Sequence, residues 1–170
     1  MDEKANYSVT VTRDQPYSRS EELLQVVSFR VGNEEFGLDI LRVHEIIRLQ
    51  ELTRVPNSPE FVDGVINLRG KVIPVIALRK RFGLPEQPHD KETRIVVLEI
   101  QNMVLGFIVD SVSEVVRIHA TTVVPPPRLG EIEREFVSGV GKLQDRLLIL
   151  LDVDQIMDAQ ERPTSSAVGA

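Results

Sequence analysis

The chain has 170 residues and a net charge of −6, with 42% hydrophobic and 27% charged residues and no cysteine. The absence of cysteine excludes disulfides, thiolate metal sites and cysteine nucleophiles, and the acidic balance argues against a general electrostatic grip on nucleic acid or anionic membranes. No apolar run approaches the ~20 residues of a membrane-spanning helix, and the first residues contain no apolar signal core. We therefore expect a cytoplasmic protein.

Short stretches rich in β-branched residues fill most of the chain between two polar ends. Residues 1–21 and 159–170 lack a periodic apolar face and are expected to be flexible tails. The body begins with an expected strand at 23–31, a turn at 32–34 and a second strand at 35–40, and the same pattern continues to residues 146–153. Helical signals are confined to residues 77–84 and 152–160, so the sequence predicts an all-β protein.

An internal repeat divides this body into two similar halves. Residues 36–47 align with 105–116 at an offset of 69, which places Gly37 on Gly106 and Glu45 on Glu114. Farther along, the offset becomes 75, which places Phe61 on Phe136, Gly64 on Gly139 and Leu68 on Leu143. A six-residue insertion between Pro125 and Phe136 accounts for the change in offset.

The repeat predicts two lobes, at residues 22–84 and 93–158, joined by a polar linker at 85–92. Each lobe has about five short strands followed by a short helix, and closing such a small sheet into a barrel removes its exposed edges. A lobe of about 65 residues is marginally stable alone. We therefore expect the two lobes to pack together and to leave a groove between them.

The sequence offers no catalytic, cofactor or metal site. His44, His89 and His119 lack the spacing of metal ligands, and no nucleophile-elbow, P-loop or dinucleotide motif is present. Asp152 and Asp154 fall at an expected helix start, where carboxylates favour the helix dipole. The basic residues Arg79 to Arg81 are interpreted as a solvated helix face.

Two kinds of residue are candidates for binding. Glu45 and Glu114 are equivalent glutamates set among apolar residues, and either a structural or a binding role fits them. In the hairpin of the first lobe, Gly70 aligns with Asp145, and both tolerate a left-handed turn. Arg69 aligns with Gln144, so the turn explains Gly70 but leaves Arg69 as either an interaction residue or a solvated turn residue.

The stretch GVINLRGKVIPV at residues 64–75 resembles the chemotaxis coupling protein family, CheW, and the resemblance covers residues 22–158. It implies two five-stranded SH3-like β-barrels without enzymatic activity or cofactor. It further implies an adaptor that joins the regulatory domain of the histidine kinase CheA to the cytoplasmic tips of methyl-accepting chemoreceptors. Such an adaptor is expected to be monomeric in isolation and to form rings in membrane-associated receptor arrays. An adaptor of this fold for a pilus or second-messenger pathway, and a small-barrel enzyme, are the alternatives.

The resemblance also implies site residues. The receptor-binding groove is expected to involve Val43, Glu45, Ile46, Gly64, Arg69, Ile95, Val112 and Val115. The kinase contact is expected between residues 47 and 55, with Ile47, Leu49, Leu52 and Val55 as candidates. One departure is Ala77, where the family usually has the aspartate that the second lobe keeps as Asp152; alanine cannot cap the following helix.

Overall fold

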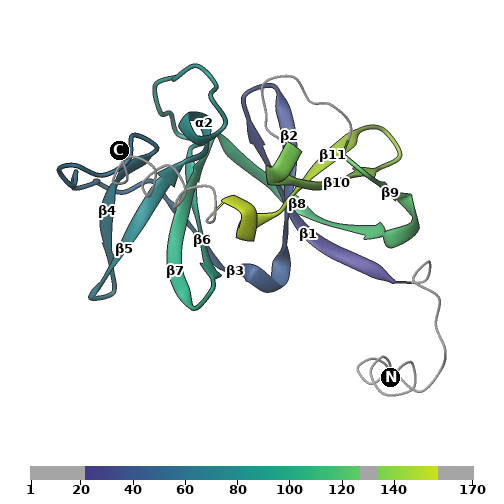
Figure 1. Ribbon diagram of the computed structural model, residues 1–170, viewed down its shortest axis with the longest axis horizontal. Helices are drawn as coiled ribbons and strands as arrows, with labels where there is room; N and C mark the ends of the chain where they lie inside the picture. Colours follow the sequence, from purple (N-terminus) through teal and green to yellow (C-terminus); the bar gives the residue numbers. More distant parts are fainter. Residues whose placement is uncertain (1–21, 127–133, 157–170) are drawn as a thin grey trace, which may run out of the picture.

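The computed structural model describes residues 22–126 and 134–156, which form two β lobes side by side (Figure 1). The strands are β1 (Leu23–Val31), β2 (Glu34–Asp39), β3 (Val43–Arg48), β4 (Val62–Leu68), β5 (Lys71–Ala77), β6 (Arg94–Ile100), β7 (Met103–Val109), β8 (Ser111–His119), β9 (Val123–Val124), β10 (Val137–Lys142) and β11 (Leu147–Leu151). The helical turns are η3 (Ile40–Arg42), α2 (Leu78–Arg81), η4 (Ala120–Thr122) and η5 (Arg134–Phe136). A last helix starts at Val153, and the part of it expected beyond Ile156 lies outside the described residues, as do both expected tails.

The two repeats exchange strands, so the lobes do not follow the predicted boundaries. One sheet has the order β8-β1-β2-β11-β10-β9, and the other has the order β3-β6-β7-β5-β4. Each lobe thus takes its first two strands from the opposite repeat. The division into 22–84 and 93–158 follows the sequence repeats, and it is wrong for the lobes, because strand pairing is non-local and the sequence alignment cannot show it.

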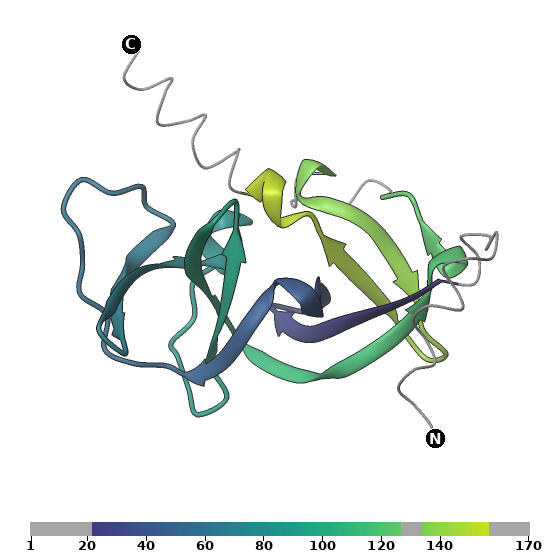
Figure 2. The same cartoon turned by 90° about the horizontal axis from the view of Figure 1, so that it is seen from below.

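The chain crosses between the lobes at η3 and between β7 and β8, and Figure 2 shows both crossings from below. An ion pair fixes each crossing to the helix of the other repeat. Arg42 follows β2 and donates to Asp154 at 2.9 Å, whereas Asp110 follows β7 and accepts from Arg79 at 2.7 Å. The two ion pairs occupy equivalent places in the two lobes, but the arginine lies at the crossing in one pair and on the helix in the other.

In each lobe, the segment that follows β3 or its equivalent β8 closes the barrel. After β3, Thr53 exchanges two backbone hydrogen bonds with Val65 of β4, at 3.0 and 2.9 Å. In the second lobe β9 pairs with β10 in the same manner. A Cβ at Gly64 would lie 2.5 Å from the carbonyl oxygen of Thr53, so this closure requires glycine there.

Three apolar clusters form the core of the described part of the chain. The largest lies between the lobes and draws on both repeats, with Phe29, Phe36, Phe82 and Phe136 in consecutive ring contacts of 5.2 to 6.0 Å. Each barrel also encloses a small cluster of its own, around Ile66, Val75 and Ile95 in one lobe and around Val26, Ile118 and Leu148 in the other. The shared central cluster explains how two marginal lobes are stable together.

Candidate functional site

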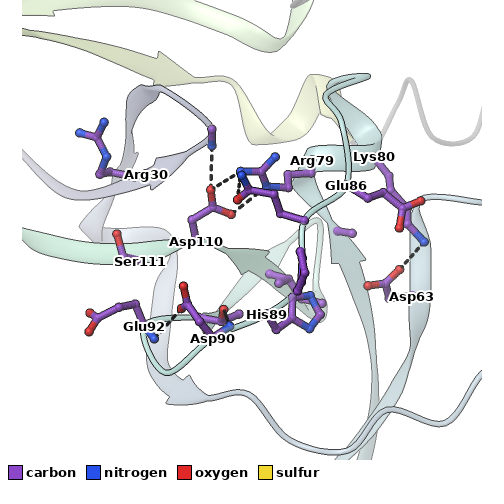
Figure 3. Close-up of a pocket in the computed structure, with 16 residues that line it drawn as sticks. Arg30, Asp63, Arg79, Lys80, Glu86, His89, Asp90, Glu92, Asp110 and Ser111 are labelled. Atoms are coloured by element: carbon purple, nitrogen blue, oxygen red, sulfur yellow. Dashed lines mark hydrogen bonds and ion pairs between the residues drawn. The ribbon is translucent and has the colours of Figure 1, made fainter.

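A pocket of about 480 Å³ lies where the chain crosses between the lobes (Figure 3). Arg79 donates to both carboxylate oxygens of Asp110, at 3.0 and 2.7 Å, and the backbone N–H of Gly32 donates to the same carboxylate at 2.8 Å. Burial alone would raise the pKa of Asp110, but the hydrogen bonds from Arg79 and Gly32 lower it below its usual range. Lys80 forms a second pair with Asp63 at 2.9 Å.

These paired charges indicate a structural role for the pocket. Arg79 also donates to the carbonyl oxygen of Pro85 at 2.6 Å and to the side chain of Gln87 at 2.9 Å, which fixes the segment expected to be a plain linker. Within residues 22–126 and 134–156, no group of three or more metal-ligating side chains could hold a metal ion.

The basic residues of α2 are not a solvated face, contrary to the sequence interpretation. Arg79 and Lys80 are ion-paired, and the guanidinium of Arg81 lies 4.6 Å from the ring centroids of both Phe61 and Phe136. These two rings are equivalent residues of the two repeats. Arg81 therefore joins the repeats by two cation–π contacts.

The hairpin between β4 and β5 presents the most distinctive polar group on the surface. Arg69 and Gly70 have φ angles of 51° and 88°, as in a type I′ turn, and the N–H of Gly70 donates to the Asn67 side chain at 2.9 Å. Arg69 donates to the carboxylate of Glu45 on β3, and this hydrogen bond raises the pKa of the guanidinium. The Arg69 side chain remains 70% exposed, so it is held in place without being buried.

The second lobe has an equivalent arginine–glutamate ion pair, but its arginine occupies a different position in the hairpin. Arg146 donates to Glu114 at 2.9 Å and to the nearly buried Glu35 at 2.8 Å. Arg146 aligns with Lys71 rather than with Arg69, so residue-by-residue alignment missed it. Aspartate tolerates a left-handed turn, but Asp145 does not use it here: among the described residues, φ is positive at four non-glycine positions, and Asp145 is not one of them.

A β-bulge precedes the glutamate in each lobe. The register of β3 against β6 shifts between Val43 and Glu45, and the register of β8 against β1 shifts at the same point of the repeat, before Glu114. Bulges commonly re-aim a side chain at a sheet edge, and β3 and β8 are the edge strands of their sheets. The bulge, the glutamate and the hairpin arginine thus form one repeated unit.

Exposed apolar side chains occur in equivalent pairs around these units. Position by position, they are Ile46 with Val115 (39% and 51% exposed), Val55 with Val124 (41% and 37%), and Val72 with Leu147 (69% and 60%). The sequence analysis missed Val72, Val124 and Leu147, although both hairpins carry an apolar residue just after the turn. We call Ile46, Val55 and Val72 the first surface, and Val115, Val124 and Leu147 the second surface.

Only part of the expected receptor groove lies on the surface. Glu45, Ile46 and Arg69 are close together on β3 and its neighbouring hairpin, and Val115 is exposed on β8. Val43 and Val112 are half-buried and pack against the central core. Ile95 is fully buried in the barrel core and Gly64 serves barrel closure, so neither can contact a partner directly in this structure.

Of the expected kinase-contact residues too, some pack inward and one lies on the surface. Ile47, Leu49 and Leu52 pack inward against the small cluster of their barrel. Val55 is the member of this group with a large exposed area. Alternation along β3 after the bulge explains the inward packing of Ile47, since its neighbours Ile46 and Arg48 are the exposed residues of this part of the strand.

The sequence of the chain is similar to that of one family of known proteins. The family model described as CheW-like domain matches residues 25–161. The chain belongs to the CheW family. It is 39% identical over 134 residues to the chemotaxis protein CheW of Klebsiella aerogenes, covering 78% of this chain and 81% of that protein. It is 39% identical over 138 residues to the chemotaxis protein CheW of Helicobacter pylori, covering 81% and 84%.

A solved CheW structure matches the fold as well. The scaffolding protein TtCheW from Thermoanaerobacter tengcongensis superposes with a TM-score of 0.75 at 40% sequence identity, over 79% of this chain and 92% of that chain. The expected fold of two SH3-like β lobes and the expected CheW membership are thereby confirmed. In the described residues, no helix is long and apolar enough to cross a membrane.

Proposed function

We propose that this CheW-family chain is a non-enzymatic adaptor that couples methyl-accepting chemoreceptors to the histidine kinase CheA. The observation that carries the proposal is the repeated surface unit: both lobes have an ordered arginine–glutamate pair and exposed apolar side chains at equivalent positions. Exposed apolar groups beside fixed charges are typical of protein-binding surfaces. The curated relatives are chemotaxis proteins, which favours this pathway over pili or second-messenger output.

The receptor contact is proposed for the β3 edge and its hairpin. Glu45 fixes the Arg69 guanidinium, and the exposed side chain of Ile46 follows directly on the strand. Val115 extends the surface from the second lobe, while Val43 and Val112 support it from the central core. An oriented, exposed arginine suits a carboxylate on a receptor tip, since its planar fork matches a carboxylate.

The kinase contact is proposed for the exposed apolar side chains of the first barrel. Val55 and Val72 are the candidates, because both expose a large fraction of an apolar side chain. Ile47, Leu49 and Leu52 would shape this region from below by packing. We further propose that the protein is cytoplasmic, monomeric in isolation and recruited to membrane-associated arrays through these contacts.

The test is co-sedimentation of the purified chain with receptor-containing membranes, with and without CheA. The chain is expected to sediment with receptor membranes, and receptor-dependent control of the kinase is expected only when the chain is present. A Val72→Asp variant should lose kinase recruitment while keeping receptor binding. Lys91→Ala, which removes an exposed charge far along the chain from both surfaces, is the control. Failure of the unaltered chain to bind either partner would refute the proposal.

A further inference from the structure

A groove of about 410 Å³ lies in the second lobe, between the edge strand β8 and the β10–β11 hairpin. Figure 2 shows the tip of this hairpin beside β8. We call it the seam groove, and its charged or titratable lining residues are Glu114, Arg117, His119, Lys142, Asp145 and Arg146. Glu114 and Arg146 belong to the repeated unit described above, whereas Arg117, His119 and Lys142 do not.

One arginine already binds both carboxylates of the seam groove. Arg146 donates to Glu114 at 2.9 Å and to Asp145 at 3.0 Å. Arg117 and Lys142 are exposed, and neither has an ion pair or a side-chain hydrogen bond among the described residues. The groove therefore contains two cations whose charge no described carboxylate neutralises.

These cations are concentrated on a lobe that is otherwise acidic. The described residues of this lobe, 22–42, 110–126 and 134–156, include ten acidic and six basic residues. Three of the six basic residues line the seam groove. The positive charge is therefore local to the groove and is not a property of the whole lobe.

The internal repeat does not account for this charge either. Arg117 aligns with Arg48 on β3, but Lys142 aligns with the uncharged Asn67. In the first lobe Asn67 accepts a hydrogen bond from the turn at Gly70, so the same position has a structural role there. The pair of unneutralised cations is thus particular to the second lobe.

The backbone of β8 adds a second feature of a binding site. This strand lies at the edge of its sheet and pairs with β1 alone among the described strands. On an edge strand, alternate residues direct their N–H and C=O groups away from the partner strand, where an added strand can pair with them. An extended peptide can use such an edge, with its side chains supplying specificity. A lipid surface or a nucleic acid has no backbone that pairs in this way.

We propose that the seam groove binds an extended acidic segment of a partner protein, whose carboxylates pair with Arg117 and Lys142. Charge complementarity sets the class of partner. The net charge of −6 disfavours contact of an acidic segment with the rest of the surface, so binding is confined to the groove. Leu147 lies opposite Lys142 in the hairpin register and is 60% exposed, which supplies an apolar contact beside the charge. The inference goes beyond the adaptor function and does not rest on it.

The probe is a fluorescein-labelled peptide of three Glu-Val repeats, and binding to the full chain is followed by fluorescence anisotropy. The chain should bind it at least about tenfold more tightly than the matched peptide with glutamine in place of glutamate. Arg117→Glu/Lys142→Glu should weaken binding by about tenfold or more, because each reversal replaces attraction by repulsion. Raising the salt concentration from about 0.05 M to about 0.5 M should also weaken it.

The matched control is Arg48→Glu, the aligned change on β3, which should leave peptide binding unchanged. Thermal unfolding checks that the variants are folded. In ¹H–¹⁵N spectra of the unaltered chain, the peptide should shift the amide signals of residues 115–119 and 142–147, which locates the site without any substitution.

Equal binding of the glutamate and glutamine peptides would overturn the proposal, as would an equal loss of binding in Arg48→Glu. Amide shifts confined to other strands would also overturn it. Sedimentation of the chain with phosphatidylglycerol vesicles that depends on Arg117 and Lys142, without peptide binding, would assign the groove to a lipid surface and refute a peptide partner.

Discussion

Replacing Arg81 by alanine should be among the most destabilising changes on the protein surface. Its guanidinium lies 4.6 Å from two ring centroids, and one ring, Phe136, is fully buried while the other, Phe61, is partly buried. A cation–π contact contributes about 0.5–1 kcal/mol when exposed and about 2 when desolvated. Together the two contacts predict a loss of about 2–3 kcal/mol, or about 5–10 °C in melting temperature for a chain of this size.

The assay is thermal and urea unfolding followed by circular dichroism. Arg81→Met keeps an apolar stem but removes the charge, so it should fall between the unaltered protein and Arg81→Ala. The control is Arg117→Ala, an exposed strand arginine. If Arg81→Ala and Arg117→Ala differ by less than about 0.5 kcal/mol, the range of ordinary surface substitutions, the two contacts do not stabilise the lobe junction. Full stability of Arg81→Met would show that packing and not charge is responsible.

Changes at four further positions test other parts of the structure. Arg69→Ala should leave the melting temperature nearly unchanged, because solvent screens an exposed ion pair, yet it should weaken receptor and kinase assembly by about tenfold or more. Arg69→Gly should be as stable or more so, since it relieves a positive φ, and Arg69→Lys should restore assembly only partly. Ala77→Asp should raise stability by about 0.5–1 kcal/mol in urea unfolding, because Ala77 makes no cap while its counterpart Asp152 accepts from the N–H of Gln155 at 3.3 Å. The pKa of Asp110 is lower in the folded than in the unfolded protein, so its stabilising contribution is present above about pH 4 and is lost as the pH falls through the folded pKa. Asp110→Asn should therefore have a lower free energy of unfolding at neutral pH, and this difference from the unaltered protein should become smaller as the pH is lowered. Ser28→Val should raise the melting temperature, because the buried Ser28 hydroxyl has no hydrogen-bond partner and Val97 occupies the equivalent position; a loss of stability would indicate overpacking.

The internal repeat and the strand-forming composition predicted much of this protein from its sequence alone. Two aligned halves of short strands without motif chemistry led to two β lobes, and the family resemblance supplied the adaptor hypothesis. The pairing of equivalent residues also carried information about the surface, since the offsets that align Phe61 with Phe136 align Val72 with Leu147. Sequence is sufficient for these conclusions because strand propensity is a property of neighbouring residues, and a repeat is found by aligning the chain with itself.

The tertiary structure alone decided how the repeats combine. Alignment shows that β1 and β6 are equivalent, but it cannot show that each pairs with the other repeat, because hydrogen bonding between strands is non-local. The same limit explains Ile95, which lies in a barrel core, and Gly64, which is needed where the Thr53 carbonyl closes the barrel. It also explains Arg146, which reaches Glu114 from a position two residues away from the one that aligns with Arg69. A side chain can reach the same carboxylate from either position of a hairpin, so the physical contact is repeated in the two lobes while the residue position is not.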